Sequence, residues 1–457
     1  MSEANADIKV IDCCEGLLAL IAENIMSTAQ KIRIEDLSNP VLSELQQAAI
    51  ANTESLQINL NVDAVLMAAM ENTGLTDFGD EGFKERLAEQ LRSTAEDTWM
   101  NNFGRMSVFA TKVQQASSRL RVVDALNRHP EIHNIEIKRP IMIAGLPRSG
   151  TTHLLNMLAA DTRFRSMPHW ESRQPVPASG EEVTHDQRDP RFQRAVQAYQ
   201  GSDAMLPLMK NMHDMNPEHI HEDIELLDID FASYTLEWMA HVPRWRDYYL
   251  AHDQTPHYGF LKTMLQVLSY YSGTGIGDAA GGDLAPKQWV TKTPQHLEQL
   301  IPLHTNFPDA TFLVTHRDPI EVFSSTATLV AYMSRIRNPV IHMDEIADYW
   351  LDRIERLLRA CLRDQQMLPA DQTMDVVFPE FMADDMAMVR RVYEFSGISL
   401  TPDAEHQLAA YLKANPRGKH GQIVYDIEAD FGLKRDALYE RFDFYYERYP
   451  QLDPHTQ

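Results

Sequence analysis

The chain has 457 residues, of which 44% are hydrophobic and 24% charged, a composition that excludes a disordered, collagen-like or solenoid protein and allows a large core. Its 42 lysines and arginines are outnumbered by 66 aspartates and glutamates, and the net charge of −24 disfavours nucleic acid and anionic membrane surfaces. Any anion that the protein binds therefore requires a local cluster of cations.

The cysteines and the N-terminus favour a cytoplasmic protein. Cys13, Cys14 and Cys361 provide neither a disulfide framework nor zinc-ligand spacing. No apolar run reaches the roughly 18 residues of a membrane span, and the first residues are acidic where a secretion signal is positively charged. We therefore expect a cytoplasmic location, no transmembrane segment and no nucleic-acid partner, while the oligomeric state stays open.

The first part of the chain reads as helical. From about residue 10 to Arg128, apolar residues recur at spacings of three and four, with almost no alternation typical of strands. Pro130 and the apolar run of residues 135–143 mark a change of character, because proline ends a helix. We predict an N-terminal helical extension over residues 1–134 and an α/β domain over residues 135–457.

Three short apolar runs predict buried parallel strands, at residues 140–144, 288–291 and 311–315. Helix signals follow each of them, including Thr293 and Asp318 as N-caps with proline next in the chain. Glu321 stands where it would complete a capping box with Asp318. Repeated strand, turn and helix predict an α/β fold with a parallel sheet flanked by helices.

A long insertion separates the first two predicted strands. It covers about residues 186–286 and reads as helical from residue 219 to residue 271. Insertions at the edge where α/β proteins bind ligands often form substrate-binding lids. The stretch from His213 to Tyr249 is rich in Met, Trp, Tyr and His, and either an acceptor pocket or a helical core explains that composition.

The first strand runs into the segment Gly145-Leu146-Pro147-Arg148-Ser149-Gly150-Thr151-Thr152 and then into a helix. Such a loop directs backbone N–H groups and the positive end of the helix dipole at one point, which suits a phosphate or a sulfate. The glycine spacing is that of a Walker A loop, but Thr151 stands in place of the motif's lysine, and Arg148 is the cation. A standard nucleoside triphosphatase is therefore disfavoured.

This PRSGTT loop resembles the 5′-phosphosulfate loop of sulfotransferases that use 3′-phosphoadenosine 5′-phosphosulfate (PAPS) as donor, in the bacterial-type branch. Arg317 and Ser325, eight residues apart, are similar to the family's 3′-phosphate segment. Lys292, in the segment WVTKTP, resembles the strand-end lysine that reaches the oxygen between phosphate and sulfate. The segment Lys419-His420-Gly421 is similar to a loop that closes over the 3′-phosphate.

The resemblance implies a P-loop-like sheet and in-line transfer of a sulfuryl group from PAPS to a hydroxyl or amine of a small-molecule or lipid-like acceptor, without a metal. Arg148 and Lys292 would neutralise the charge that grows on the leaving oxygen. The residues that would hold the 5′-phosphate are Ser149, Gly150, Thr151 and Thr152. The product would be 3′-phosphoadenosine 5′-phosphate (PAP).

The resemblance also points to a general base, because related sequences carry an acidic residue a little over twenty positions after the loop arginine. Glu171 has this separation, and burial beside Trp170 would raise its pKa toward the range of a base. His169 and His296 are the alternatives, and Glu222 is the next residue to consider within the insertion.

Two other functions stay open from the sequence, a nucleotide-dependent small-molecule kinase and a non-catalytic nucleotide-binding module. The kinase would need Mg²⁺ and a loop lysine, which position 151 lacks. A metal site is a further alternative, with His213, His219, His221, Glu222 and Asp223 as its ligands. We predict no metal there, because residues 219 and 221 share a face only on a strand and this stretch reads as helical.

Overall fold

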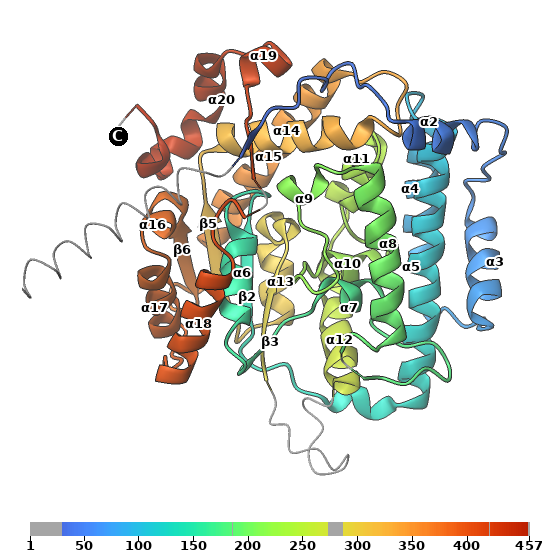
Figure 1. Ribbon diagram of the computed structural model, residues 1–457. Helices are drawn as coiled ribbons and strands as arrows, with labels where there is room; N and C mark the ends of the chain where they lie inside the picture. Colours follow the sequence, from blue (N-terminus) through green and yellow to red (C-terminus); the bar gives the residue numbers. More distant parts are fainter. Residues whose placement is uncertain (1–29, 185, 273–286, 420, 456–457) are drawn as a thin grey trace, which may run out of the picture.

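The computed structural model describes residues 30–184, 186–272, 287–419 and 421–455. Within them a five-stranded sheet has the order β3-β4-β2-β5-β6, and each pair of neighbours is parallel (Figure 1). The strands are β2 (Ile141–Gly145), β3 (Phe164–Arg165), β4 (Gln288–Lys292), β5 (Thr311–His316) and β6 (Thr373–Val377). All three predicted strands are confirmed, and they are the three central strands of the sheet.

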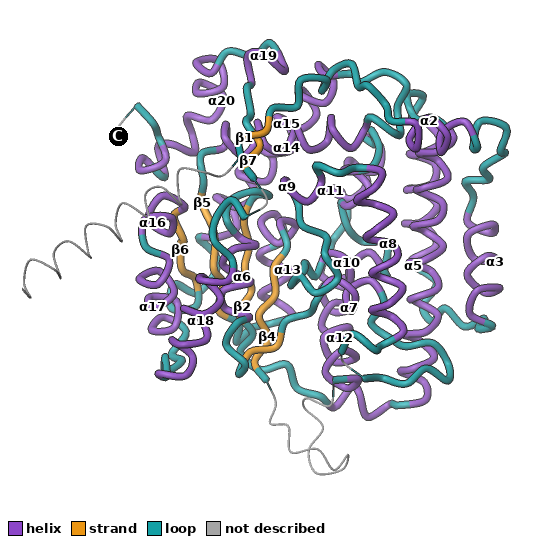
Figure 2. Tube along the Cα trace, viewed as in Figure 1, coloured by secondary structure: helices purple, strands orange, loops and turns teal. Residues whose placement is uncertain are grey.

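Both faces of the sheet are covered by helices (Figure 2), which explains why β2 is apolar along its whole length. Successive residues of a strand point to opposite faces, so Ile141 and Ile143 pack into one hydrophobic cluster and Met142 and Ala144 into another. Helices α6 (Thr151–Ala159), α16 (Phe378–Ala383), α17 (Asp385–Phe395) and α18 (Pro402–Ala414) contribute to the first cluster. Helices α12 (Thr255–Tyr271), α13 (Leu300–Asn306), α14 (Pro319–Ser334) and α15 (Met343–Gln365) contribute to the second.

Residues 30–134 are largely helical, as the apolar spacing predicts. They contain α2 (Glu44–Ala51), α3 (Val62–Thr73), α4 (Phe83–Glu96), α5 (Asn102–Arg128) and the 3₁₀ helix η1 (Pro130–Asn134). The short strand β1 (Lys31–Ile32) was not predicted, and it pairs in parallel with β7 (Gln422–Ile423) near the other end of the chain. The predicted helix before residue 30 lies outside the described residues. No helix that the structure describes has the length and apolarity needed to cross a membrane.

The insertion is less continuous than its sequence suggests. Helix α7 (His169–Arg173) precedes it. The insertion itself contains α8 (Pro190–Met205), α9 (Met209–Met212), α10 (Ile224–Asp228), η2 (Thr235–Trp238), α11 (Pro243–Ala251) and α12. The prediction of a helix from residue 219 is wrong, because residues 219–223 have no helical turn. Ile220 pairs with Pro168 in an antiparallel bridge, and the N–H groups of His221 and Asp223 donate to the carbonyls of Met167 and Lys292. These tertiary hydrogen bonds override the local helical pattern.

The helix caps agree with the sequence in part. The Thr293 side chain accepts a hydrogen bond from the N–H of Gln295, although the turn that follows is the 3₁₀ helix η4 (Pro294–Glu298). Asp318 accepts from the N–H of Ile320 at 2.8 Å and caps α14. The capping box with Glu321 is not formed, because the Glu321 carboxylate pairs with Arg435 instead. The chain ends in α19 (Ile427–Phe431), α20 (Arg435–Arg448) and η5 (Pro450–Leu452).

Candidate active site

A cavity of about 720 Å³ opens at the carboxyl ends of β2, β4 and β5. Pro147, Arg148, Gly150, Thr151 and Thr152 line it from the loop after β2 and the start of α6. Lys292, the last residue of β4, and Arg317, the residue after β5, line the same cavity. Because the carboxyl ends of parallel strands meet at one edge, residues 140 or more positions apart in the sequence converge here.

The loop between β2 and α6 is built to hold an anion. Arg148 and Gly150 both have a left-handed backbone, with φ of 65° and 88°, which curls the chain and turns its N–H groups toward one concave surface. Ser149 is buried within the loop, where its Oγ donates to the carbonyl of Leu146 at 2.6 Å and lies 2.7 Å from Thr315 Oγ1. The Ser149 side chain therefore shapes the loop, while its neighbours face the cavity.

Three cations gather around this loop. Lys292 Nζ donates to Thr152 Oγ1 at 3.0 Å and pairs with the Glu222 carboxylate. Arg148 Nε donates to Ser325 Oγ at 2.9 Å, and the Arg317 guanidinium donates to the Arg148 carbonyl. The predicted separation of Arg317 and Ser325 thus places both beside the loop arginine.

Arg317 has no carboxylate partner among the described residues. Asp318 caps α14 and accepts from the Tyr446 hydroxyl at 2.7 Å, and Glu321 pairs with Arg435. The Arg317 guanidinium instead lies over the Phe378 ring, 4.3 Å from its centre. Burial lowers the pKa of Arg317, and Arg148 adds to this effect while the Glu321 carboxylate opposes it. The arrangement therefore favours an anionic ligand.

Glu171, the expected general base, does not line this cavity. Its carboxylate is buried and pairs with Arg165. Helix α7 presents His169 and Arg173, four residues apart, to the cavity, and Glu171 lies midway between them on the opposite side. This position does not fit a base that must reach an acceptor in the cavity.

His296, an alternative base, is fully buried away from the cavity, with Asp223 at 3.1 Å and the Tyr258 hydroxyl at 3.0 Å. Lys419 and Gly421 do not line the cavity either. The Lys419 ammonium lies 3.4 Å from Asn415 Oδ1, beside a second, smaller hollow, and Gly421 packs against Gln30 and Ile32 next to β7. His420 lies outside the described residues.

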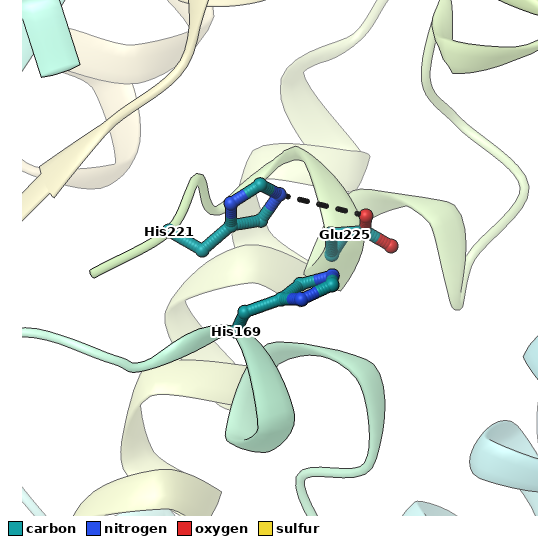
Figure 3. A group of neighbouring side chains, drawn as sticks. All are labelled: His169, His221 and Glu225. Carbon is teal, nitrogen blue, oxygen red and sulfur yellow. Dashed lines mark ion pairs between the residues drawn. The ribbon is translucent and has the colours of Figure 1, made fainter. Parts of the chain in front are cut away.

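A group of His169, His221 and Glu225 forms another wall of the cavity (Figure 3). His169 Nδ1 donates to the Met215 carbonyl at 3.0 Å, which leaves Nε2 as the unprotonated nitrogen, buried and without a partner among the described residues. Burial, followed by the nearby His221, lowers the pKa of His169 to about 3. His169 is therefore a weak proton acceptor at neutral pH.

Glu225 lies 3.7 Å from His221 Nε2 and 3.1 Å from Arg173. Burial alone would raise its pKa, but Arg173 and His221 outweigh burial and lower it. Glu225 and Arg173 were not among the predicted site residues. Their approach depends on how α7 packs against α10, for which the sequence carries no local signal.

The rest of the cavity wall is mostly apolar. Its residues come largely from the insertion and include Leu206, Met209, Met215, Ile224, Trp238 and Met239. The composition of residues 213–249 thus reflects, in part, a cavity wall. One end of the cavity is cationic and concave, and the other offers an apolar surface beside a few polar side chains.

Comparison with known proteins gives one family. A model of the sulfotransferase family matches residues 140–402, whereas none of the curated proteins matches the chain. Among solved structures, the chain is similar to the sulfotransferase STF1 of Mycobacterium tuberculosis H37Rv, with 25% identity, a TM-score of 0.72, and coverage of 85% of this chain and 99% of that one. It is also similar to STF9 of Mycobacterium avium, with 24% identity, a TM-score of 0.74, and coverage of 86% and 98%.

Proposed function

The chain belongs to the sulfotransferase family, and on this premise we propose that it transfers a sulfuryl group from PAPS to a hydroxyl or amine of a small-molecule or lipid-like acceptor. The observation that carries the proposal is the convergence of Arg148, Lys292 and Arg317 on one cavity, where Lys292 pairs with Glu222 while Arg148 and Arg317 form no ion pair with a described carboxylate. In a protein of net charge −24, such a cluster marks the place for a multiply charged anion.

The donor would lie along this cluster. The backbone of Gly150 and the hydroxyls of Thr151 and Thr152 would hold the 5′-phosphate, at the N-terminus of α6. Arg317, with Ser325 next to the loop arginine, would hold the 3′-phosphate. Lys292 and Arg148 would then face the oxygen that bridges phosphate and sulfur.

Transfer requires one bond to form and one to break. The acceptor oxygen or nitrogen attacks sulfur, the bond from sulfur to the bridging oxygen breaks, and PAP leaves with the negative charge that Lys292 and Arg148 stabilise. The acceptor's proton passes to a base. Holding both substrates in line in one cavity supplies much of the rate, because the encounter becomes effectively intramolecular.

We propose Glu222 as this base. Its carboxylate lines the cavity and pairs with Lys292, so it lies next to the group that would face the leaving oxygen. Glu171 and His296 do not line the cavity, and the low pKa of His169 makes it a weak base. When Lys292 turns to the donor, the Glu222 carboxylate is released to accept the proton.

The apolar part of the cavity supports an acceptor with an apolar body, which suits a small molecule or a lipid-like alcohol. The few cysteines, without disulfide spacing, support a cytoplasmic location.

Binding and turnover together test the proposal. PAP should stabilise the protein by about 2.7 kcal/mol at a hundredfold excess over its Kd, with no effect of a metal chelator, and ADP should stabilise it far less. With labelled PAPS, a panel of alcohols, phenols and amines should yield a sulfated product detected by its mass. Equal stabilisation by ATP with Mg²⁺ would favour the kinase, and PAP binding without any sulfated product would favour a non-catalytic nucleotide-binding module.

A further inference from the structure

Arg337 lines the cavity of the donor cluster from a different part of the chain. Helix α14 has 16 residues and therefore spans ~24 Å; Arg317 precedes its first turn, and Arg337 follows its last. Both arginines nevertheless line the same cavity. Two cations whose backbones lie at opposite ends of this helix thus face one cavity.

The backbone of Arg337 is fixed on both sides. Its N–H donates to the Ser334 carbonyl at 2.9 Å, and its carbonyl accepts from the N–H of Asn101 at 2.8 Å. Gly104, on α5, packs so closely that an added Cβ there would lie 3.1 Å from Arg337 Cβ. The N-terminal extension therefore holds Arg337 in place at the cavity wall.

The guanidinium of Arg337, in contrast, has no partner within the part of the chain that the structure describes. Its Nε is buried without a hydrogen bond, and no carboxylate of the described residues lies within ion-pair distance. Burial lowers the pKa of Arg337 to about 10, so the group still carries its charge at neutral pH. An unpaired positive charge therefore faces the cavity.

The buried arginines of the described residues are paired, whereas Arg337, which is only partly buried, is not. Arg119 pairs with Asp230, Arg191 with Asp189, and Arg353 with both Glu237 and Glu298. A buried charge without a partner lowers the stability of the fold, because the water that it loses is not replaced by other polar groups. An arginine that lacks an ion-pair partner at a cavity wall is therefore expected to pair with an anionic group of a ligand.

We propose that Arg337 binds a carboxylate on the acceptor, so that the acceptor is an amphiphilic hydroxy or amino acid. The proposal rests on the proposed function and deepens it. The planar guanidinium matches a carboxylate with two parallel hydrogen bonds. Met333, one helical turn before Arg337, and Trp238 and Met239 of the insertion line the same cavity and suit the apolar body.

The first test is the choice of acceptor. Long-chain hydroxy acids of increasing length are compared with their methyl esters, which keep the shape and lose the charge. The wild type should favour the acid, and Arg337→Met should lower kcat/KM for the acid by about tenfold to a hundredfold while leaving the ester nearly unchanged. The kcat/KM of Arg337→Lys for the acid should lie between those of the wild type and Arg337→Met, because lysine keeps the charge but lacks the two parallel N–H donors. Equal use of acid and ester by the wild type, or equal loss for both in Arg337→Met, would overturn the proposal.

The second test measures binding and needs no turnover, so it separates this proposal from the proposed function. With PAP present, a long-chain fatty acid should raise the Tm of the wild type more than the matching alcohol, and Arg337→Met should abolish the difference. If inorganic phosphate alone gives the same Arg337-dependent rise, Arg337 binds a free anion and the assignment to the acceptor is wrong. If the acid raises the Tm but nothing is ever sulfated, the anion site stands and the proposed function fails.

The free protein provides a matched control for folding. Arg337→Met should leave the Tm without ligand unchanged or raise it, because it removes a partly buried charge that has no ion-pair partner among the described residues. Arg353→Met should lower the Tm strongly, because it leaves the Glu237 and Glu298 carboxylates buried without their partner. A Tm that falls as much in Arg337→Met as in Arg353→Met would show a structural role for Arg337 and contradict the proposal.

Discussion

At the scale of single residues, the pair of Lys292 and Glu222 is central to the proposed chemistry. Both side chains are largely buried and they contact one another, so each satisfies the charge of the other while the cavity has no donor. When PAPS binds, its phosphate competes with Glu222 for Lys292, so that Lys292 exchanges the carboxylate for the phosphate. Binding of the donor and activation of the base would thus be coupled through a single lysine.

Glu222→Gln should lower kcat by about 10²–10⁴-fold, because glutamine keeps the shape but accepts no proton. PAP should bind more tightly than to the wild type, because the uncharged side chain no longer competes for Lys292, and the acidic limb of the pH–rate profile should disappear. Glu171→Gln is the matched control: it weakens a buried ion pair with Arg165, so it should lower the Tm and leave the turnover of the folded protein nearly intact. The reverse pattern would restore Glu171 as the base.

His169 should make the protein sensitive to acid. Its pKa is about 3 in the fold against 6.5 in the unfolded chain, so the unfolded state binds the extra proton as the pH falls below 6.5, and stability is lost toward pH 3. Between pH 6.5 and about pH 4.5 this loss amounts to about 2–3 kcal/mol. Chemical denaturation at both pH values should show a smaller loss in His169→Gln, and an identical loss would refute the assignment.

The motifs predict which cations meet, but they do not predict which carboxylate joins them. Arg148, Lys292 and Arg317 follow strands, and the parallel sheet brings strand ends together whatever lies between them. Glu171 lies on a helix of five residues, where a shift of two positions turns a side chain to the opposite face. The number of residues between Arg148 and Glu171 therefore does not predict whether the Glu171 side chain points toward the cavity or away from it.

At the scale of elements, the turn from β2 into α6 depends on close backbone packing against β5. A Cβ on Gly145 would lie 1.9 Å from Thr315 Oγ1 and 2.9 Å from Ser149 Oγ. The hydroxyls of Ser149 and Thr315 are hydrogen-bonded to each other, which ties the loop to β5 two residues before Arg317. The glycine therefore permits the contact that aligns the loop with Arg317.

Gly145→Ala should lower both the Tm and the affinity for PAP, since its methyl group displaces Thr315 and with it the end of β5. Thr315→Ala removes the oxygen that the new methyl group meets. In a double-mutant cycle of thermal stability, the second change should recover part of the loss caused by the first, with a favourable coupling of about 0.5–3 kcal/mol. Simple additivity of the two effects would contradict this account of the turn.

The sequence predicts the three central strands because they are buried on both faces of the sheet, so that each contains a short apolar run. The edge strand β3 has two residues, and β1 and β7 pair across nearly the whole chain, so none of them carries a local signal. Residues 219–223 mislead for the same reason. Their backbone groups form hydrogen bonds with Met167, His169 and Lys292, which are distant in the sequence.

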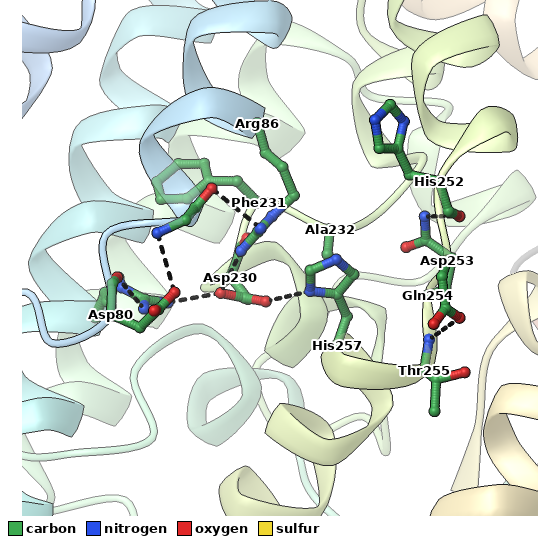
Figure 4. Close-up of polar contacts among 12 residues, drawn as sticks. Asp80, Arg86, Asp230, Phe231, Ala232, His252, Asp253, Gln254, Thr255 and His257 are labelled. Atoms are coloured by element: carbon green, nitrogen blue, oxygen red, sulfur yellow. Dashed lines mark hydrogen bonds and ion pairs between the residues drawn. The ribbon is translucent and has the colours of Figure 1, made fainter.

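At the scale of the whole molecule, Asp230 joins the N-terminal extension to the insertion. Its carboxylate lies 2.7 Å from Arg86 of α4 and 2.6 Å from His257 of α12 (Figure 4). Arg119 of α5 approaches the same carboxylate at 2.7 Å and also donates to the carbonyl of Phe78. A single acidic residue thus holds three basic groups from three helices, which makes the extension part of the fold around the cavity.

Asp230→Asn should reduce the free energy of unfolding by about 3–5 kcal/mol, because it leaves the buried Arg119 without a counter-charge. Asp186→Asn is the control, since its pair with Arg188 is exposed and should contribute little to stability. Urea denaturation followed by far-UV circular dichroism measures both. A small effect of Asp230→Asn, similar to that of the control, would show that the extension and the insertion are only loosely joined.

The central claim is that the cationic cavity binds PAPS with its 3′-phosphate on Arg317. The most direct measurement is calorimetric titration of the wild type and Arg317→Ala with PAPS and with adenosine 5′-phosphosulfate, which lacks that phosphate. The wild type should bind PAPS more tightly, and Arg317→Ala should weaken PAPS by about 1.5–3 kcal/mol while leaving adenosine 5′-phosphosulfate nearly unchanged. Equal affinity of the wild type for both nucleotides, or an equal loss for both in the variant, would contradict the claim.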